Sequence, residues 1–246
     1  MNQNFVRNME KACKLAAQVL EKTGALVAPG VTTNELDKYA DGLTLAAGAT
    51  SAPLNYHGFP KAICTSVNSV LCHGIPDDTS LKAGDIVNID ITVNLNGYFG
   101  DCSATYYVGL GNAPEIVRVA YEAMMAGIQR IRPNGHTGDI GWASNGVAKA
   151  NGMVTAELLG GHGIGKAFHM KPHVPGNGQF GTGDILRPWT CITVEPIVCE
   201  SSAGYNRVTV PNSKIEYYTM NDHSLAAQFE HTVLITDTGY VILTIP

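Results

Sequence analysis

Long apolar runs, clusters of basic residues and paired cysteines are all missing from this chain of 246 residues. No stretch approaches the ~20 apolar residues that a membrane-spanning helix requires. Residues 1–10 lack the cationic and then apolar layout of a secretory signal. No basic run exceeds two residues and the formal net charge is −5, so neither a nucleic acid nor a membrane is an expected partner. These absences predict a globular protein of the cytoplasm.

Motifs for other chemistries are absent as well. The six cysteines form neither a C-x-x-C pair nor zinc-finger spacing, which predicts reduced thiols. The zinc-protease motif H-E-x-x-H and the serine-hydrolase motif G-x-S-x-G do not occur. Hydrophobic residues make up 45% of the chain and no Ser/Gly-rich linker interrupts it, so residues 1–246 are expected to form a single domain.

Pairs of helices alternate with groups of strands along the sequence. Apolar residues recur at helical spacing near the N-terminus, and Thr32 with Glu35 has the spacing of a helix-capping box. Helices are predicted at 5–27, 32–47, 114–131 and 137–150, and strands at 62–73, 85–108, 190–199, 206–210, 226–236 and 240–244.

The order of these elements repeats, and so does a short motif. Residues 29–36 read PGVTTNEL and residues 133–140 read PNGHTGDI, so proline, threonine, an acid and an aliphatic residue recur in step. Turn and capping chemistry alone would produce much of this match. With the element order, it predicts two pseudo-twofold-related halves, about 1–110 and 111–246, with a cleft for a site between them.

Asp90 and Asp101 lie in two strands that are predicted to form a hairpin. Residues 87–94 alternate between aliphatic and polar side chains, and the Asn-Gly pair at 96–97 favours a tight turn. A two-residue turn pairs Asp101 with Thr92 and makes Asp90 its diagonal neighbour, roughly 7–8 Å away; a four-residue turn places the two acids directly opposite. A lone Asp in an alternating strand is usually solvated, but two like charges on one patch are destabilising unless a cation lies between them.

Three further metal-seeking side chains lie in apolar or glycine-rich segments farther along. Glu195 sits within ITVEPIV, Glu230 within AAQFEHTVLIT, and His162 within GGHGIG. A carboxylate in such surroundings is unfavourable without a cationic partner. An edge strand could carry Glu230 harmlessly, and His162 could be incidental to a flexible loop.

Taken together, the donors are one imidazole and four carboxylates, with no thiolate. This set favours Mn²⁺, Fe²⁺ or Co²⁺ and allows Zn²⁺. Five ligands are too many for one catalytic ion with an open position, and they suit two ions about 3.5–4 Å apart. The residues themselves therefore predict a di-metal hydrolase.

Several longer motifs surround these residues: YHGFPKAIC (56–64), NSVLCHGIPDD (68–78), LKAGDIVNIDITV (81–93), GYFGD (97–101), GHGIG (161–165), FH (168–169), TVEPIV (193–198) and SLAAQFEHTVLIT (224–236). With these motifs the chain resembles the type I, bacterial-sized methionine aminopeptidases, from Met9 to Thr244. The resemblance implies the pita-bread fold, an α/β (α+β) arrangement in which helices cover an antiparallel sheet with an internal pseudo-twofold axis.

The resemblance also implies a function, a metalloaminopeptidase that removes the initiator methionine from nascent polypeptides. It assigns Asp90 to one ion, His162 and Glu195 to the other, and Asp101 and Glu230 to both as bridges. A water between the ions would lose its proton and attack the first peptide bond, with Glu195 as general acid/base. The resemblance allows ribosome association and favours a monomer.

Further residues are carried over from the same motifs. His73 is expected near the substrate amine and scissile amide, and His169 is expected to hydrogen-bond the scissile carbonyl. His57 is expected near the pocket. Tyr56, Phe59, Cys64 and Phe168 match positions that line the methionine pocket, where aromatic and sulfur neighbours suit a thioether. Each of them could instead be structural.

Two segments depart from the family pattern at the substrate mouth. An aromatic wall is expected from Tyr217 or Tyr218, where many bacterial members carry a Trp, or it is missing. Residues 170–183 are longer and less acidic than in typical members. These departures leave two alternatives open: a same-fold aminopeptidase of shifted, X-Pro-type specificity, and a non-catalytic peptide-binding module.

Overall fold

The computed structural model describes residues 3–209 and 214–246 of the chain. Every helix predicted from the sequence is present, and α2 begins at the predicted capping box, where Thr32 and Glu35 bond each other's backbone N–H groups. The first helix buries the predicted apolar face, including Met9, Ala12 and Cys13. The helices are α1 (Gln3–Gly24), α2 (Thr33–Ala46), α3 (Glu115–Ile128) and α4 (Thr137–Ala150).

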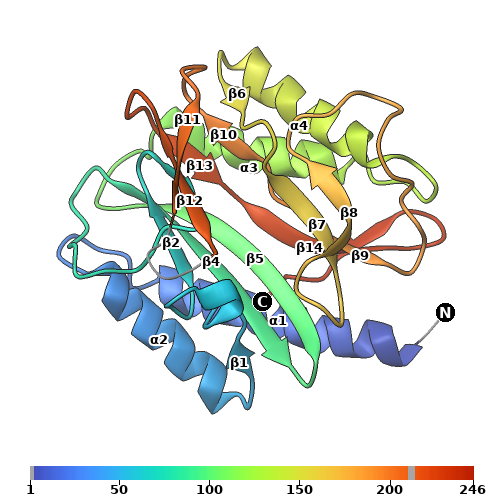
Figure 1. The fold of residues 1–246 in the computed structure, drawn as a ribbon, viewed down its shortest axis with the longest axis horizontal. Coiled ribbons are helices and arrows are strands. Elements are labelled where there is room, and N and C mark those ends of the chain that lie inside the picture. Colours follow the sequence, from blue (N-terminus) through green and yellow to red (C-terminus); the bar gives the residue numbers. More distant parts are fainter. Residues whose placement is uncertain (1–2, 210–213) are drawn as a thin grey trace.

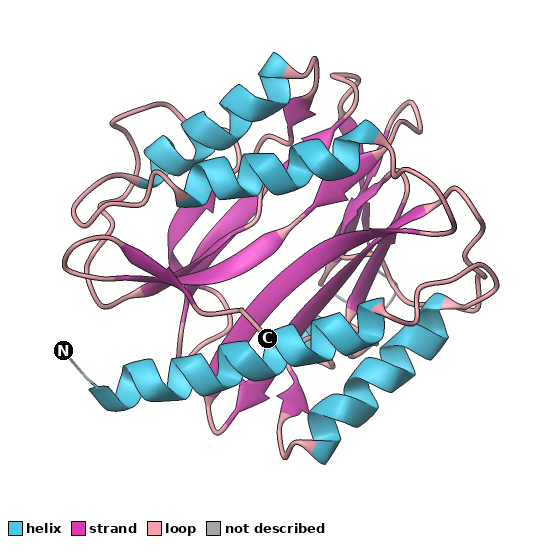
Figure 2. Cartoon of the chain, turned by 180° about the vertical axis from the view of Figure 1, so that it is seen from behind, coloured by secondary structure: helices cyan, strands magenta, loops and turns pink. Residues whose placement is uncertain are grey.

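The centre of the fold is one curved antiparallel sheet. The helices lie behind it in Figure 1 and in front of it in Figure 2, with α1 and α2 over one half and α3 and α4 over the other. The sheet runs in the order β1 (Thr50–Ser51), β4 (Ile86–Leu95), β5 (Tyr98–Tyr107), β14 (Glu230–Ile235), β9 (Cys191–Val194), β7 (Gly160–Ile164) and β8 (Met170–Pro175), with β2 (Cys64–Val67) on β4 and β15 (Tyr240–Ile242) on β14.

Two smaller sheets stand beside the main one. The first sheet comprises β13 (Ala226–Gln228), β10 (Ile197–Cys199) and β6 (Val154–Thr155), and the second comprises β11 (Tyr205–Thr209), β12 (Glu216–Met220) and β3 (Val70–Cys72). The division of the chain into halves at about residue 110 stays a prediction.

The β4–β5 hairpin confirms the two-residue turn predicted at Asn96-Gly97. Thr92 faces Asp101 across the strands, and Asp90 faces Ser103. Asp90 and Asp101 are therefore diagonal neighbours on one face of the sheet. The turn fixes the register, and the register brings the two acids together.

Three predicted strands are interrupted in the structure, and the first of them, 62–73, breaks at residues 68–69 between β2 and β3. The predicted strand 190–199 is interrupted at residues 195–196, and 226–236 is interrupted at Phe229. Glu230 lies in a central strand between β5 and β9, so the edge-strand alternative is wrong. The predicted end of strand 206–210 lies outside the described residues.

The GGHGIG segment is a strand, β7, and the loop alternative for it is also wrong. Its glycines are needed because neighbouring backbones approach closely. A Cβ at Gly161 would lie 2.2 Å from the Thr193 carbonyl oxygen, and one at Gly163 would lie 2.1 Å from the Lys171 carbonyl oxygen. This close packing fixes the position of His162 in the sheet. No helix in the described part of the chain has the length and apolar character that crossing a bilayer requires.

Candidate metal centre

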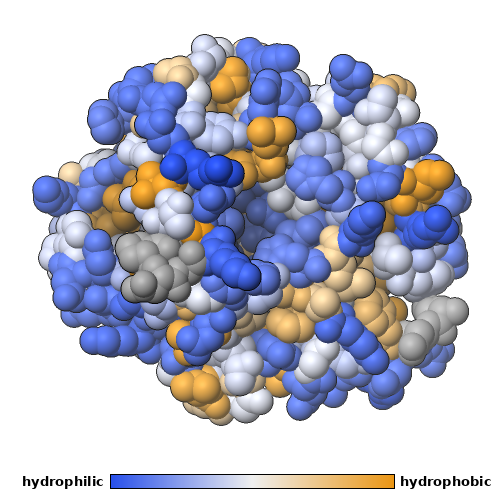
Figure 3. Space-filling model, in the orientation of Figure 1, coloured by the Kyte–Doolittle hydropathy of each residue, from blue (hydrophilic) through white to orange (hydrophobic). Residues whose placement is uncertain are grey.

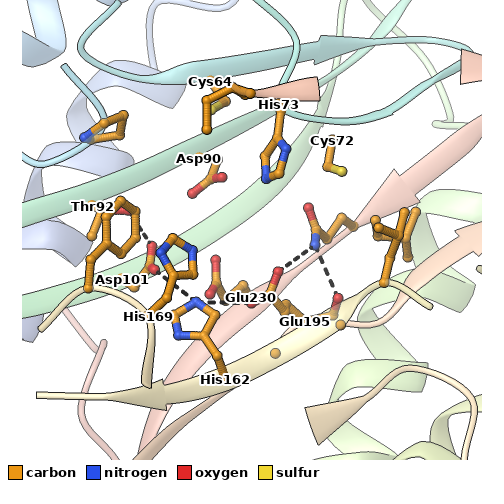
Figure 4. A pocket seen from close by; sticks show the side chains of 18 of the residues that line it. Cys64, Cys72, His73, Asp90, Thr92, Asp101, His162, His169, Glu195 and Glu230 are labelled. Carbon is orange, nitrogen blue, oxygen red and sulfur yellow. Dashed lines mark hydrogen bonds and ion pairs between the residues drawn. The ribbon is translucent and has the colours of Figure 1, made fainter. Parts of the chain in front are cut away.

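A cavity of about 360 Å³ opens on the face of the molecule that the helices leave uncovered. Figure 3 shows this face hollowed near its middle, with hydrophilic residues in the hollow. All five side chains predicted as metal ligands line the cavity, and Figure 4 shows them gathered there from separate segments of the chain. They are Asp90, Asp101, His162, Glu195 and Glu230.

Three of these side chains are especially close together. One ligand atom each from Asp101, His162 and Glu230 all lie within 4.8 Å of one another. They come from β5, β7 and β14, which the sheet order places near one another although the sequence separates them. Such a triplet of two carboxylates and an imidazole can hold a divalent ion.

The His162 ring presents its Nε2 atom to the acids. Its Nδ1 lies 3.0 Å from the Gly163 carbonyl oxygen, which can only accept, so Nδ1 carries the proton. Nε2 then has a free lone pair and lies 3.7 Å from Asp101 Oδ2 and 3.6 Å from Glu195 Oε1. These separations are too long for hydrogen bonds, and they leave the lone pair available to a metal.

Glu195 is held in place by two neighbouring side chains. The Thr193 hydroxyl donates to its Oε1 at 2.8 Å, and Gln228 Nε2 donates to its Oε2 at 3.0 Å. The same Gln228 nitrogen also reaches the Glu195 backbone carbonyl at 3.1 Å. This double contact fixes the carboxylate at the point where the strand is interrupted.

Asp90 has an oxygen atom that the described part of the protein leaves unpaired in the cavity. Its Oδ1 is buried and has no hydrogen-bond partner among the described residues. Leaving a buried carboxylate oxygen unpaired is costly unless a cation meets it. Its place beside the other four ligands fits a divalent ion.

The ionisation of the acids points the same way. Burial raises the pKa of Asp90 to about 7 and that of Glu195 to about 8. Burial, and then repulsion between the acids, raises the pKa values of Asp101 and Glu230 well above their ordinary range. Burial lowers the pKa of His162 to about 4, so the ring is neutral and able to bind a metal. Two hard divalent ions would compensate such a group of acids.

His73 and His169 both face the cavity, and the hydrogen bond of His73 indicates its tautomer. His73 Nδ1 donates to the Glu216 carbonyl oxygen at 2.9 Å, which leaves Nε2 without a proton. His169 Nδ1 lies 3.0 Å from the Tyr56 hydroxyl. Burial lowers the pKa of both rings, that of His169 to about 3. Both are therefore neutral at pH 7.

The predicted pocket residues Tyr56, Phe59, Cys64 and Phe168 all line the cavity. His57 does not line it; its side chain is exposed and its ring packs 4.3 Å from that of Tyr56. A role for His57 near the substrate stays a prediction.

Other lining residues were not predicted. Thr92 donates to Asp101 at 2.7 Å, and Gln228 supports Glu195 as described. His173 faces His162 across β7 and β8. At the mouth, Ile215 lines the cavity, whereas Tyr217 and Tyr218 are not among its lining residues. The alternating pattern of residues 87–94 could have indicated that Thr92 lies on the same face as Asp90. No local feature of the sequence indicates that the other residues line the cavity.

Comparison with known proteins identifies the family. Residues 7–237 match metallopeptidase family M24. The chain is 44% identical to a methionine aminopeptidase of Rickettsia prowazekii, covering 98% of this chain and 93% of the relative. It is 41% identical to methionine aminopeptidase A of Synechocystis sp., covering 100% and 96%.

Solved structures agree with this assignment and with the predicted pita-bread fold. The methionine aminopeptidase of R. prowazekii superposes with a TM-score of 0.94 at 41% identity, covering 100% of this chain and 98% of that one. The enzyme of Thermotoga maritima gives 0.93 at 30% identity, covering 100% and 98%. A prolidase of Pyrococcus furiosus, 22% identical with a TM-score of 0.75, covers 100% and 65% and shares the fold alone. The chain belongs to metallopeptidase family M24 and, within it, to the methionine aminopeptidases of type I.

Proposed function

We propose that this protein is a di-metal aminopeptidase that removes the N-terminal methionine from nascent proteins and peptides. The observation that carries the proposal is the group of four acids, two buried and two partly buried, and one neutral imidazole around a single cavity. In a metal-free protein, holding these acids together would lower the stability of the fold when they ionise, because their negative charges repel one another. The family membership given above supplies the substrate class.

The five ligand residues are proposed to hold two divalent ions, with Co, Mn, Fe and Zn as the candidates. When bound, such ions activate a water and polarise the scissile carbonyl. Everything else in the reaction falls to the side chains of this chain.

Glu195 is the proposed general acid and base. It accepts the proton of the attacking water and returns it to the departing amine. Its Oε1 faces the ligand atoms, since it lies 3.6 Å from His162 Nε2, while Gln228 fixes Oε2. The carboxylate is thus oriented before substrate arrives, which lowers the entropy cost of proton transfer.

The two further histidines are proposed to contact the peptide bond. With the Tyr56 hydroxyl donating to Nδ1, His169 carries its proton on Nε2 and can donate it to the scissile carbonyl oxygen. His73 has the opposite tautomer, so its bare Nε2 can accept the N–H of the scissile amide. One ring thus stabilises the developing oxyanion and the other orients the leaving group.

Methionine selectivity is assigned to the aromatic end of the cavity. The rings of Tyr56 and Phe168 lie 4.9 Å apart, and Phe99 stacks on Phe168 at 5.9 Å. Aromatic edges and the Cys64 thiol offer a soft, polarisable surface that suits a thioether. Binding of the free α-amine at the metal centre would limit cleavage to the first bond.

The setting of the reaction is proposed from two observations. All ligand residues belong to one chain, so a monomer suffices for activity. All six cysteines are free and buried, which suits the reducing cytoplasm, where nascent chains leave the ribosome.

The proposal is tested by release of methionine from a Met-Gly peptide by protein loaded with Mn²⁺, Co²⁺ or Fe²⁺. Asp90→Ala and Glu195→Ala should abolish release, while Glu10→Ala, an exposed acid on α1, should retain it. Chelation should abolish release and added metal should restore it. A panel of first residues separates the alternatives: cleavage only before proline would indicate an X-Pro enzyme, and no cleavage with retained peptide binding would indicate a binding module.

A further inference from the structure

Leu158 combines two unfavourable features at the mouth of the cavity. Its side chain is 93% exposed although it is a large aliphatic group, and it lines the cavity that holds the metal ligands. Its backbone has φ 65, in the left-handed region that a leucine avoids because its Cβ crowds the following carbonyl. A leucine that is both exposed and strained calls for a reason beyond folding.

The flanking residues hold Leu158 in this position. The Glu157 carbonyl accepts a hydrogen bond from the Tyr205 hydroxyl of β11. The Leu159 carbonyl accepts one from the backbone N–H of Gly176 at 3.3 Å. The Leu159 side chain packs against an aliphatic cluster that includes Cys72 and Ile197. With both neighbours fixed, the Leu158 side chain is directed outward at the rim.

The cavity has two apolar ends. The aromatic end consists of Tyr56, Phe168 and their neighbours, and the aliphatic end consists of Cys72, Leu159 and Ile197. In Figure 4, Cys72 and Thr92 lie on opposite sides of Asp90. A peptide whose methionine fills the aromatic end would extend past the metal centre toward the aliphatic end.

We infer that Leu158 determines specificity for the leaving chain, by packing against apolar side chains beyond its first residue. The inference rests on the proposed aminopeptidase function and adds a preference to it. Leu158 is poorly covered in the free protein, so contact with an apolar side chain removes surface of both from water. Polar side chains at the same positions gain nothing from this contact.

The experiment compares two peptides, Met-Gly-Leu-Leu-Gly and Met-Gly-Ser-Ser-Gly, as substrates of the metal-loaded enzyme. The expected result is a kcat/KM about five- to tenfold higher for the leucine peptide. The difference should lie in KM, because the contact is made equally in the bound substrate and in the transition state. In Leu158→Ala the ratio of the two kcat/KM values should fall to about 1.

Two further variants keep the test decisive. Leu158→Gly adopts the positive φ without strain, so it should lower the ratio as Leu158→Ala does even if alanine perturbs the loop. Leu110→Ala removes another leucine, fully exposed and outside the cavity lining, and should retain the wild-type ratio.

The outcomes separate this inference from the function on which it rests. Equal kcat/KM values for the two peptides in the wild-type enzyme overturn the inference alone. The inference is also overturned if the ratio of the two kcat/KM values stays at the wild-type level in both Leu158 variants. This holds even if both variants cleave the two peptides more slowly by the same factor. A wild-type protein that releases no methionine from either peptide overturns the proposed function together with this inference.

Discussion

Removing the metal should make the stability of this protein fall as pH rises from about 6.5 to about 8. The metal-free cavity holds four acids whose pKa values are all raised by burial, and three of them also by repulsion from neighbouring acids. Each is neutral in the folded protein at a pH where the unfolded chain has already lost the proton. Ionising them in the folded state places like charges together, and bound cations would remove that penalty.

The magnitude follows from the pKa values. Burial raises the pKa of Asp90 from 3.8 to about 7. Because one pKa unit is about 1.4 kcal/mol, this shift corresponds to on the order of 4 kcal/mol of unfolding free energy. That stability is lost as the pH rises from 3.8 to about 7. Each carboxyl that stays protonated only in the folded state lowers the unfolding free energy by about 1.4 kcal/mol per pH unit. A single such group therefore accounts for about 2 kcal/mol between pH 6.5 and pH 8.

The histidines set the lower limit of this window. Burial depresses the pKa values of His162, His169 and His231, so their contribution to stability is present above the unfolded pKa of 6.5 and is lost as pH falls. Below about pH 6.5 they oppose the carboxyls. Above it, the raised carboxyl pKa values dominate.

The assay is urea unfolding of chelator-treated protein across this pH range, repeated with excess Mn²⁺. Metal-free protein should lose at least about 2 kcal/mol between pH 6.5 and pH 8, and the metal-loaded protein should change little. Asp90→Asn should raise the unfolding free energy of the metal-free protein at pH 8 by on the order of 2–4 kcal/mol. Metal-free stability that is flat or rises with pH would refute the reasoning.

Three further substitutions test the fold and the site. Thr32→Ala removes the capping box with Glu35 and should lower the unfolding free energy by about 1 kcal/mol, measured by urea titration, without changing kcat. Gly100→Ala should destabilise by about 3 kcal/mol or more, or prevent folding, because its Cβ would lie 2.4 Å from the backbone of α1; a normal melting temperature would contradict the close packing. Tyr56→Phe removes the hydroxyl that we propose donates to His169 Nδ1, and it should lower kcat about tenfold or more, with a smaller change in KM, in a steady-state assay. An unchanged kcat would dismiss that role for the hydroxyl.

The helices and the hairpin could be predicted because their signals are local. The capping box fixes the start of α2, and the Asn-Gly turn fixes which residues of β4 and β5 face each other. The diagonal placement of Asp90 and Asp101 follows from that register alone. Apolar periodicity was enough for the rest of the helical layer.

What the sequence could not give depends on contacts between distant segments. The glycines of β7 are typical of a loop in the sequence alone. They lie in a strand because β8 and β9 approach it so closely that a side chain would not fit. Gln228 supports Glu195 although the two residues lie 33 positions apart in the sequence. The residues that flank Leu158 are likewise held by distant partners, Tyr205 of β11 and Gly176. No periodicity in a single segment records such pairings.

The most direct test is anomalous diffraction from crystals grown with Mn²⁺. Two peaks should appear in the cavity, bound by the side chains of Asp90, Asp101, His162, Glu195 and Glu230. An empty cavity at saturating Mn²⁺, or ions bound only at other residues, would contradict the central claim that divalent cations hold these acids together.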